Sequence, residues 1–192
     1  MNRQMIENIN TGAIKISIVG CGGLGSNVAM NLIRAGISSI ELIDFDVVSE
    51  SNLNRQFYFR DQIGQLKVDA LKANLERIDH CAKIHCINTR ISDNNIDAIL
   101  SSADIIFECV DNQSIKEIVT RYALLNNKFI IAASGISETN MKYPTKVRKI
   151  STKFYIVGDF VTDIRNGDTP MSAKVGIVAA QQADILLDIL NQ

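Results

Sequence analysis

The chain lacks the features that mark secreted, membrane-bound or nucleic-acid-binding proteins. Its first ten residues, MNRQMIENIN, contain no apolar stretch of the kind found in a signal peptide. No run approaches the ~20 apolar residues that span a bilayer. The formal net charge is −1, from 20 basic and 21 acidic residues, so no strong field attracts a nucleic acid or a membrane surface. We therefore expect a soluble cytoplasmic protein with no membrane partner.

Paired cysteine motifs are absent as well. The four cysteines are Cys21, Cys81, Cys86 and Cys109, and no two of them form C-x-x-C. A structural zinc site needs four closely spaced ligands, and only His80 and His85 stand near the central pair, so we expect no zinc. Cys21 and Cys109 are interpreted as small buried residues, with a thiol near the substrate as the alternative.

The length and the composition favour one folded domain over residues 1–192. Hydrophobic residues make up 46% of the chain and charged residues 21%, which suffices for a real core and is too apolar for disorder. We divide the domain into a core (14–134), a β-rich extension (135–158), a loop (159–171) and a closing helix (172–190).

A glycine-rich motif follows the first predicted strand, residues 16–19. Gly20, Gly22 and Gly25 form G-x-G-x-x-G, with Gly23 in one of the variable positions. Glycines let the backbone approach phosphate, and the start of the next helix offers free N–H groups. The motif alone is weak, because tight glycine turns also occur for purely structural reasons.

An acidic residue at the end of the second predicted strand strengthens this interpretation. Residues 40–43 predict an apolar strand that ends at Asp44, 24 positions beyond Gly20. An acid at this place in the fold binds ribose hydroxyls. Strand, glycine turn, helix, strand and acid together predict a crevice for a nucleotide or dinucleotide.

The rest of the chain continues the alternation of helix and strand. The pattern predicts helices over 65–79, 93–101 and 113–126 and strands over 83–88, 104–110 and 128–132. This predicts an α/β fold with a Rossmann-like parallel sheet and helices on both faces. The β-rich extension predicts antiparallel strands added to that sheet. The closing helix is apolar on most sides, which favours burial in the core or at an interface.

The residues beyond Asp44 are more than a plain dinucleotide-binding domain requires. Arg55 and Lys67 are cations that suit a triphosphate. Asp111 and Asn112 follow a predicted strand, where a carboxylate can hold Mg²⁺.

Each of these residues has a plainer alternative. The alternatives are a surface ion pair for Arg55, a solvated side chain for Lys67, and helix N-caps for Asp111 and Asn112. The interpretation therefore rests on their joint occurrence around one crevice.

The motifs resemble those of the ThiF/MoeB/HesA adenylyltransferases, bacterial relatives of ubiquitin-activating enzymes. G-C-G-G-L-G-S, L-I-D-F-D-x-V, S-N-L-N-R-Q, G-Q-L-K and D-N occur in order within residues 14–134. A-K-V-G-I-V-A-A-Q-Q-A is similar to the closing helix of that family. The resemblance implies that ATP and Mg²⁺ convert the C-terminal glycine carboxylate of a ubiquitin-like sulfur carrier protein into an acyl-adenylate, with release of pyrophosphate.

The resemblance also implies roles for particular residues. Gly23 should lie against the nucleotide, Asp44 should bind ribose, and Asp111 should coordinate Mg²⁺. The expected nucleotide-binding residues are Gly20, Gly22, Gly23, Gly25, Asp44, Asp46, Asn52, Asn54, Arg55, Gln56, Lys67, Asp111 and Asn112. The expected catalytic residues are Arg3, Arg55, Lys67 and Asp111. Arg3 is the candidate for an arginine that, in the family, reaches into the site of the second subunit, and a solvated terminal arginine is the alternative.

The substrate and the assembly follow from the same resemblance. The chain resembles the shorter ThiF-like version found with thiamine-thiazole biosynthesis, which favours a ThiS-like carrier over a molybdopterin carrier. We expect a homodimer, and a docking surface for the carrier within residues 132–158. No cysteine follows Cys109, so we expect the reaction to stop at adenylation. Lys116 stands where relatives often have an arginine, which keeps the charge and loses the bidentate fork.

Other functions remain as alternatives at this stage. They are adenylation of a tRNA-bound carboxylate, a nicotinamide-dependent oxidoreductase, and a scaffold without catalysis. The near-neutral charge argues against a tRNA partner. The S-N-L-N-R-Q segment argues against an oxidoreductase, which has no use for triphosphate-binding cations at that place.

Overall fold

A single seven-stranded sheet organises the computed structural model, which describes residues 3–10, 13–139, 141–162 and 170–190, with side chains from Glu7 onward. The strands are β1 (Ile16–Val19), β2 (Ser39–Asp44), β3 (Lys83–Asn88), β4 (Ile105–Glu108), β5 (Phe129–Ala133), β6 (Lys146–Ser151) and β7 (Phe154–Gly158). Their order across the sheet is β3-β2-β1-β4-β5-β7-β6. All neighbouring pairs are parallel except β6–β7, so the predicted Rossmann-like fold class is confirmed.

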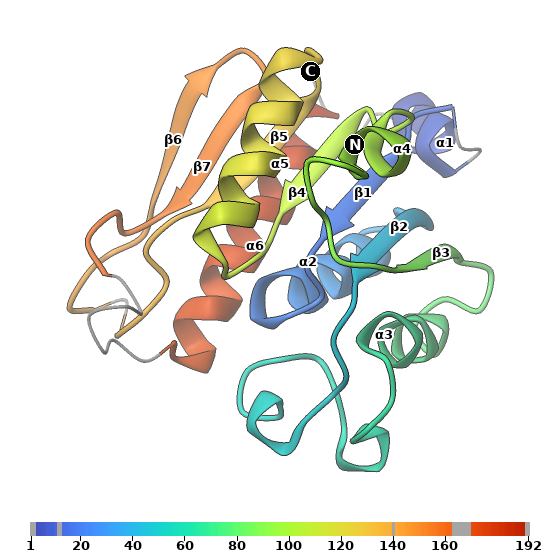
Figure 1. Ribbon diagram of the computed structural model, residues 1–192, viewed down its shortest axis with the longest axis vertical. Coiled ribbons are helices and arrows are strands. Elements are labelled where there is room, and N and C mark those ends of the chain that lie inside the picture. The colour runs from blue at the N-terminus through green and yellow to red at the C-terminus, as the bar shows by residue number, and fades with distance from the viewer. Residues whose placement is uncertain (1–2, 11–12, 140, 163–169, 191–192) are drawn as a thin grey trace.

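Helices cover both faces of the sheet (Figure 1). They are α1 (Arg3–Asn10), α2 (Gly23–Arg34), α3 (Lys67–Glu76), α4 (Ile96–Leu100), α5 (Gln113–Leu125) and α6 (Ser172–Ile189), with 3-10 turns at Glu50–Asn52 and Arg60–Gln62. The helices α2, α3 and α6 bury apolar side chains such as Leu32, Leu71 and Leu186 against one face. The helices α4 and α5 bury a second cluster against the other face, which includes Leu100 and Val119.

The apolar closing helix is a core element. One side of α6 packs against α2 and another reaches β5, where the Gln182 side chain donates to the carbonyl of Ile131 at 3.2 Å. Its residues Val175, Val178, Ala179 and Leu186 are buried. The sequence allowed two explanations for the apolar surface of this helix, burial in the core or burial at an interface. Its packing in the core accounts for that surface. No helix in the described part of the chain is both long and apolar enough to cross a bilayer.

The β-rich extension differs in part from the prediction. The strands β6 and β7 do form an antiparallel hairpin, but β7 lies parallel to β5 and continues the parallel sheet. Only β6 runs against the others. The hairpin turn reverses the chain at residues 152–153, so the returning strand has the direction of β5.

The helix α1 was not predicted from the sequence.

The predicted loop 159–171 begins with a segment that contains two buried polar residues, Asp159 and Thr162. Residues 163–169 of that loop lie outside the described part of the chain. Asp159 is buried and forms an ion pair with Lys174 of α6, whose ammonium also donates to the carbonyl of Ser137 at 2.7 Å. The two segments that follow β5 and β7 are thereby fixed to the start of the closing helix.

Several donors converge on the Asp159 carboxylate. The backbone N–H groups of Val161 and Thr162 donate at 2.7 and 2.9 Å, and the Thr162 hydroxyl donates at 2.7 Å. Burial by itself would raise the pKa of the Asp159 carboxyl, but the hydrogen bonds from Lys174, Thr162 and Val161 outweigh it and hold that pKa below its usual value.

Substitution of Asp159 by Asn should therefore destabilise the protein in a pH-dependent way. At neutral pH we expect a loss of about 3–5 kcal/mol in the free energy of unfolding, because Lys174 remains as a buried unpaired charge. A carboxyl with a lowered folded pKa contributes stability above its unfolded pKa of about 3.9 and loses it as the pH falls through the folded value. The difference between wild type and variant should therefore shrink in acid, as measured by urea unfolding at several pH values.

Asp93→Asn is the matched control for this prediction. Asp93 pairs with Arg121 on the surface, where both side chains are at least half exposed, so its loss should cost less than about 1 kcal/mol. Equal urea midpoints for the two variants at neutral pH would contradict the role given to Asp159.

Candidate functional site

The carboxyl ends of β1, β2 and β4 meet at one edge of the sheet. The chain passes from β1 outward to β2 and β3 and then returns to β4 on the other side of β1. In open parallel sheets, ligands bind at such a reversal of strand order. The long segment that follows β2 extends below this edge in Figure 1. The segments that contain the glycine motif, Asp44 and Asp111 all leave the sheet here.

Two glycines of the motif permit close packing of backbone. Gly20 has φ +92°, and a Cβ at this position would lie 2.8 Å from the carbonyl oxygen of Cys109. A Cβ at Gly25 would lie 1.8 Å from the carbonyl oxygen of Gly20. Side chains at either position would force β1, β4 and α2 apart.

The other two glycines stand at the start of α2, where a Cβ at Gly23 would lie 3.2 Å from Val175 but Gly22 is open. Gly22 is the N-cap of α2 and Gly23 its first residue. A Cβ at Gly22 would meet nothing nearer than the Gln56 amide nitrogen, at 3.9 Å. The backbone here can be approached from outside, and the first N–H groups of a twelve-residue helix favour an anion.

Asp44 is tied to the glycine turn. Its Oδ2 accepts from the backbone N–H of Cys21 at 2.6 Å, and its Oδ1 accepts from the N–H of Asp46 at 2.8 Å. These bonds orient the carboxylate at the end of β2, where the side chain remains half-buried. Each carboxylate oxygen retains a further lone pair for a ligand hydroxyl.

Arg55 lies across the glycine turn. Its side-chain carbons approach the Cβ position of Gly23 to 3.6 Å, and Asn27 donates to both the Gly23 and the Arg55 carbonyls. The guanidinium donates to neutral oxygens of Asn54, at 2.8 Å, and Ser51, at 3.3 Å. Arg55 forms no ion pair with any described residue, so the alternative of a surface ion pair is not supported.

Lys67 is buried at the start of α3. Its ammonium donates to Asp46 Oδ2 at 2.8 Å, and its backbone N–H donates to the Asp46 carbonyl at 2.9 Å. The side chain is 8% exposed, so the alternative of a solvated lysine is wrong. A buried charge needs a partner, and one carboxylate leaves two of the three ammonium protons available.

A tyrosine that we did not single out joins these segments. The Tyr58 hydroxyl donates to the Cys21 carbonyl at 2.7 Å and, at 3.3 Å, to the Lys67 carbonyl. Burial is the main cause that raises the pKa of Tyr58 well above its usual value, and the carboxylates of Asp44 and Asp46 add to it, so the hydroxyl stays a donor. In the sequence Tyr58 is the middle residue of an F-Y-F run, which gives no signal that its hydroxyl joins the glycine turn to α3.

The side-chain amides of Asn52 and Gln56 differ in whether their oxygen accepts a hydrogen bond. Asn52 accepts from the Ser49 N–H at 3.0 Å and caps the turn Glu50–Asn52. The Gln56 side chain is 9% exposed, and its Oε1 is buried without a hydrogen-bond partner among the described residues. An unpaired buried acceptor costs about 1–3 kcal/mol, which a ligand or a water next to Gly22 would offset.

The segment after β4 contributes an exposed acid and a cap. Asn112 accepts from the Ile115 N–H at 3.1 Å and is the N-cap of α5. The alternative of a helix N-cap is therefore confirmed for Asn112. The Asp111 side chain is exposed. Lys116 is committed elsewhere, because its ammonium binds the buried Glu108 carboxylate at 2.5 Å and the Ala133 carbonyl at 2.9 Å.

The cysteines of the site are not nucleophiles. Cys21 and Cys109 are buried, as predicted. Burial is the main cause that raises the pKa of both thiols well above the ordinary range, and Asp44 and Glu108 add to it. Both thiols therefore stay protonated at neutral pH.

Arg3 is not brought to this crevice by the described contacts. It is the first residue of α1, and its side chain lies outside the described part of the chain. At the other end of α1, Asn10 binds the Gly36 carbonyl and accepts from Lys83, at the amino edge of the sheet. The role of Arg3 in the site of a second subunit stays a prediction.

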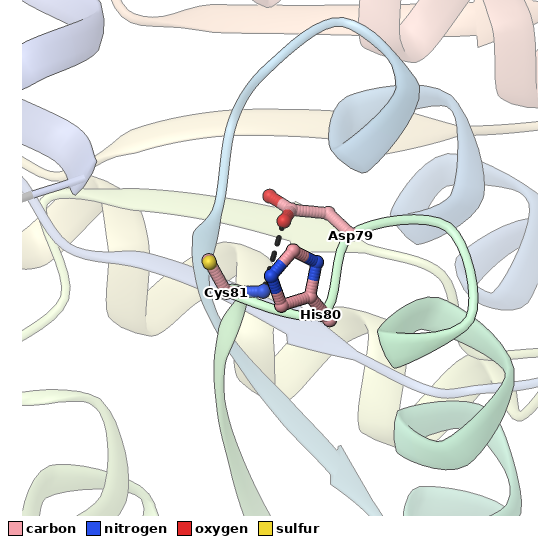
Figure 2. A group of neighbouring side chains, drawn as sticks. All are labelled: Asp79, His80 and Cys81. Carbon is pink, nitrogen blue, oxygen red and sulfur yellow. Dashed lines mark hydrogen bonds between the residues drawn. The ribbon is translucent and has the colours of Figure 1, made fainter.

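Three side chains that could serve as metal ligands lie on the turn between α3 and β3 (Figure 2). Ligand atoms of Asp79, His80 and Cys81 lie within 4.8 Å of one another, and the Asp79 carboxylate accepts from the Cys81 N–H at 2.9 Å. This turn is at the amino edge of the sheet, away from the glycine motif. Three donors on an exposed turn do not make the four-ligand structural site that zinc requires, and the absence of zinc stays a prediction.

Comparison with known proteins defines the class. The described elements form a Rossmann-like sheet, with the glycine motif, Asp44 and Asp111 at the edge where the strand order reverses. The chain belongs to the ThiF family, whose family model matches residues 6–192.

The relatives by sequence are named adenylyltransferases. The molybdopterin-synthase adenylyltransferase of Haemophilus influenzae is 37% identical over 110 residues, which cover 57% of this chain and 45% of that protein. The adenylyltransferase and sulfurtransferase uba4 of Aspergillus niger is 34% identical over 123 residues, which cover 64% of this chain and 26% of that protein. The chain thus spans less than half the length of these relatives.

The relatives by structure share the fold. The Escherichia coli tRNA N6-threonylcarbamoyladenosine dehydratase, solved in complex with ATP, has a TM-score of 0.82 and 18% identity, and covers 99% of this chain and 92% of that one. The Escherichia coli protein MccB, solved with ATP, has a TM-score of 0.76 and 22% identity, with 97% of this chain and 57% of that one covered. At these identities the likeness concerns the fold.

Replacement of Tyr58 by Phe tests the link between the glycine turn and α3. We expect the free energy of unfolding to fall by about 1 kcal/mol, and nucleotide affinity to fall several-fold because Lys67 and Cys21 lose their shared donor. Isothermal titration with ATP measures the affinity. Tyr122→Phe is the control, because its hydroxyl binds Asp97 at 2.9 Å on another helix pair. Equal loss of affinity in both variants would contradict the link.

Proposed function

We propose that this protein uses ATP to adenylate the C-terminal glycine carboxylate of a ubiquitin-like sulfur carrier protein, with release of pyrophosphate. One observation carries the proposal. The side chain of Arg55 lies on Gly23, and the buried Lys67 is joined to the same glycine turn through Tyr58. Two cations beside an open helix N-terminus suit the phosphates of ATP, which carry more negative charge than the pyrophosphate of a dinucleotide.

The residues present fit ATP. The open backbone at Gly22, where a Cβ would meet nothing nearer than the Gln56 amide nitrogen at 3.9 Å, leaves room for phosphate. Asp44, oriented by the Cys21 N–H, would accept from the ribose hydroxyls. Asn52 and Asn54 support the turn that carries Arg55, so we assign them to positioning of that turn.

Magnesium has one suitable ligand in this arrangement. Asp111 would hold Mg²⁺, because its exposed carboxylate follows a strand that ends beside Gly20. The ion would neutralise phosphate charge when bound. Asp46 is held by Lys67 and would keep that ammonium aimed at the crevice.

The chemistry needs alignment more than it needs a reactive side chain. A carboxylate oxygen of the substrate attacks the α-phosphorus, the bond to the β-phosphate oxygen breaks, and pyrophosphate leaves with the electron pair. Arg55 and Lys67 would stabilise the charge that develops on the phosphate oxygens. Both cysteines near the crevice stay protonated and buried, so they offer no thioester step. We therefore propose that the reaction stops at the adenylate.

Single substitutions of the two cations test this proposal. Arg55→Ala and Lys67→Ala should each lower the rate of ATP–pyrophosphate exchange by ~10²–10³, because each removes charge stabilisation from the transition state. Lys72→Ala is the matched control, since Lys72 lies on the same helix and forms only a weak surface pair with Glu76 at 3.8 Å. Unchanged turnover in both crevice variants would contradict the roles given to Arg55 and Lys67.

The identity of the carrier protein is the more specific part of the proposal. We propose a ThiS-like carrier of thiamine-thiazole biosynthesis. The relatives named above also support a molybdopterin-type carrier, and the tRNA dehydratase similar over 92% of its length makes a tRNA-bound carboxylate a second candidate. A homodimer remains part of the proposal, and the molar mass in solution tests it.

Intact-mass spectrometry distinguishes these substrates. With ATP and Mg²⁺, we expect the adenylate mass on a ThiS-like carrier and none on the same carrier without its terminal glycine, which lacks the positioned carboxylate. A molybdopterin-type carrier and unfractionated tRNA complete the panel. Modification of either of these in preference to the ThiS-like carrier would contradict the assignment.

A further inference from the structure

A second hollow lies at the amino edge of the sheet, away from the glycine motif. Where the chain enters β1, β2 and β3, polar and apolar residues alternate strictly, although buried parallel strands are usually continuous apolar runs. The apolar members Ile16, Ile40 and Ile84 are buried on the face covered by α2, α3 and α6. The polar members therefore lie on the other face. They are Lys15, Ser17, Ser39, Glu41, Lys83 and His85.

Strand register brings these polar residues into two rows. In the inner row, Ser17 lies opposite Glu41, and Glu41 lies opposite His85. In the row nearer the edge, Ser39 lies opposite Lys83. Neighbouring strands are about 4.8 Å apart, so one small molecule can reach side chains from all three strands.

This polar face borders a cavity. On the carboxyl half of the same face, Val19 and Ile43 join Leu100 of α4 in the second apolar cluster. The amino half instead lines a cavity of about 570 Å³, together with Ser102 from the segment after α4. Cavities of this size hold small ligands when a few polar groups converge on them.

The centre of the cavity wall is a hydrogen-bond acceptor. The Ser17 side chain is 1% exposed, and its hydroxyl donates to Glu41 Oε2 at 2.8 Å. The Glu41 carboxylate is thereby oriented, and it is half-buried without an ion pair to any described residue. Partial burial of a carboxylate without a cation is unfavourable, so a further donor from a ligand would be stabilising.

Two lysines stand on either side of this carboxylate, Lys15 towards β1 and Lys83 towards β3. Both are exposed, and neither forms an ion pair within the described residues. The Lys83 ammonium donates to the Asn10 carbonyl at 3.4 Å, and the Lys15 backbone N–H donates to the Asp104 carboxylate at 2.9 Å. Both ammonium groups keep donors for an anion at the rim of the cavity.

This arrangement selects among possible occupants. A nucleic acid would bring phosphates against the Glu41 carboxylate as well as the lysines, and a like-charge contact is unfavourable. An apolar ligand would cover Glu41 without supplying a donor. A small molecule with an anionic group for the lysines and hydroxyl groups for Glu41 and Ser39 would satisfy all of these side chains.

We propose that this cavity binds a small hydroxylated anion. Its phosphate or carboxylate would lie between Lys15 and Lys83, and one of its hydroxyl groups would donate to Glu41. The cavity and the nucleotide crevice lie at opposite edges of the sheet, so this ligand site is independent of the proposed function. Its occupant would stabilise β1, β2 and β3 at the edge where only their backbone pairing now joins them.

Amide chemical shifts of the isotope-labelled protein test the site, with ATP and Mg²⁺ present to occupy the crevice. Titration with ribose 5-phosphate or with gluconate should shift amides of residues 15–17, 39–41 and 83–85, and the two probes distinguish a phosphate from a carboxylate. Sulfate, which has no hydroxyl donor for Glu41, should bind about ten-fold more weakly than the better probe. Ribose, which has no anionic group, should leave these amides unshifted.

Variants of the lining assign the two halves of the ligand. Lys15→Met and Lys83→Met should each raise the Kd of the better probe about five-fold or more, because each removes a charged donor. Lys146→Met is the matched control, an exposed lysine at the start of β6, and should leave that Kd unchanged. Glu41→Gln should abolish the preference over sulfate, because a neutral amide accepts the hydroxyl more weakly and no longer repels the anion.

The outcomes separate the cavity from the proposed function. Shifts confined to residues 20–25 and 44–67, no shifts with either probe, or equal Kd values for wild type and Lys15→Met would overturn the cavity site alone. A Glu41→Gln variant with an altered molar mass by light scattering would make this face an interface between copies and would also overturn it. Probe binding at the cavity without ATP–pyrophosphate exchange would leave the cavity site in place and contradict the proposed function.

Discussion

The absence of a side chain at Gly25 is the constraint on which the site depends. A Cβ there would lie 1.8 Å from the Gly20 carbonyl oxygen, so only glycine lets the first turn of α2 rest on the end of β1. This contact aims the start of the helix at the crevice. It also places Gly23 beneath Arg55 and against Val175 of α6, so the closing helix and the phosphate side of the site share one support.

Polar groups hold the rest of the crevice to that turn. Asp44 accepts from the Cys21 N–H, Tyr58 donates to the Cys21 carbonyl, and Lys67 is held by Asp46. The buried pair Lys174–Asp159 holds the segments after β5 and β7 to the start of α6. Each of these contacts joins residues from different elements, so together they hold the elements around the site in fixed positions.

Local patterns made most of the fold predictable. Residues 16–19 are three apolar residues and a serine, followed by Gly20, and they form β1 with those bounds. The position of Asp44 at the end of β2 followed from the same kind of pattern. The direction of β7 did not, because pairing with β5 is a contact between distant residues. The burial of Lys67 and the role of Tyr58 were also beyond the sequence, since both depend on which segments meet in space.

Protection of backbone amides by ATP and Mg²⁺, followed by hydrogen exchange, tests the central claim most directly. If one crevice binds the nucleotide, exchange should slow together in the glycine turn, in the residues that follow Asp44 up to Lys67, and around Asp111. The turn at residues 79–81, at the amino edge, should be unaffected. Protection limited to one of the three segments, or greatest at the amino edge, would contradict a single site built from all of them.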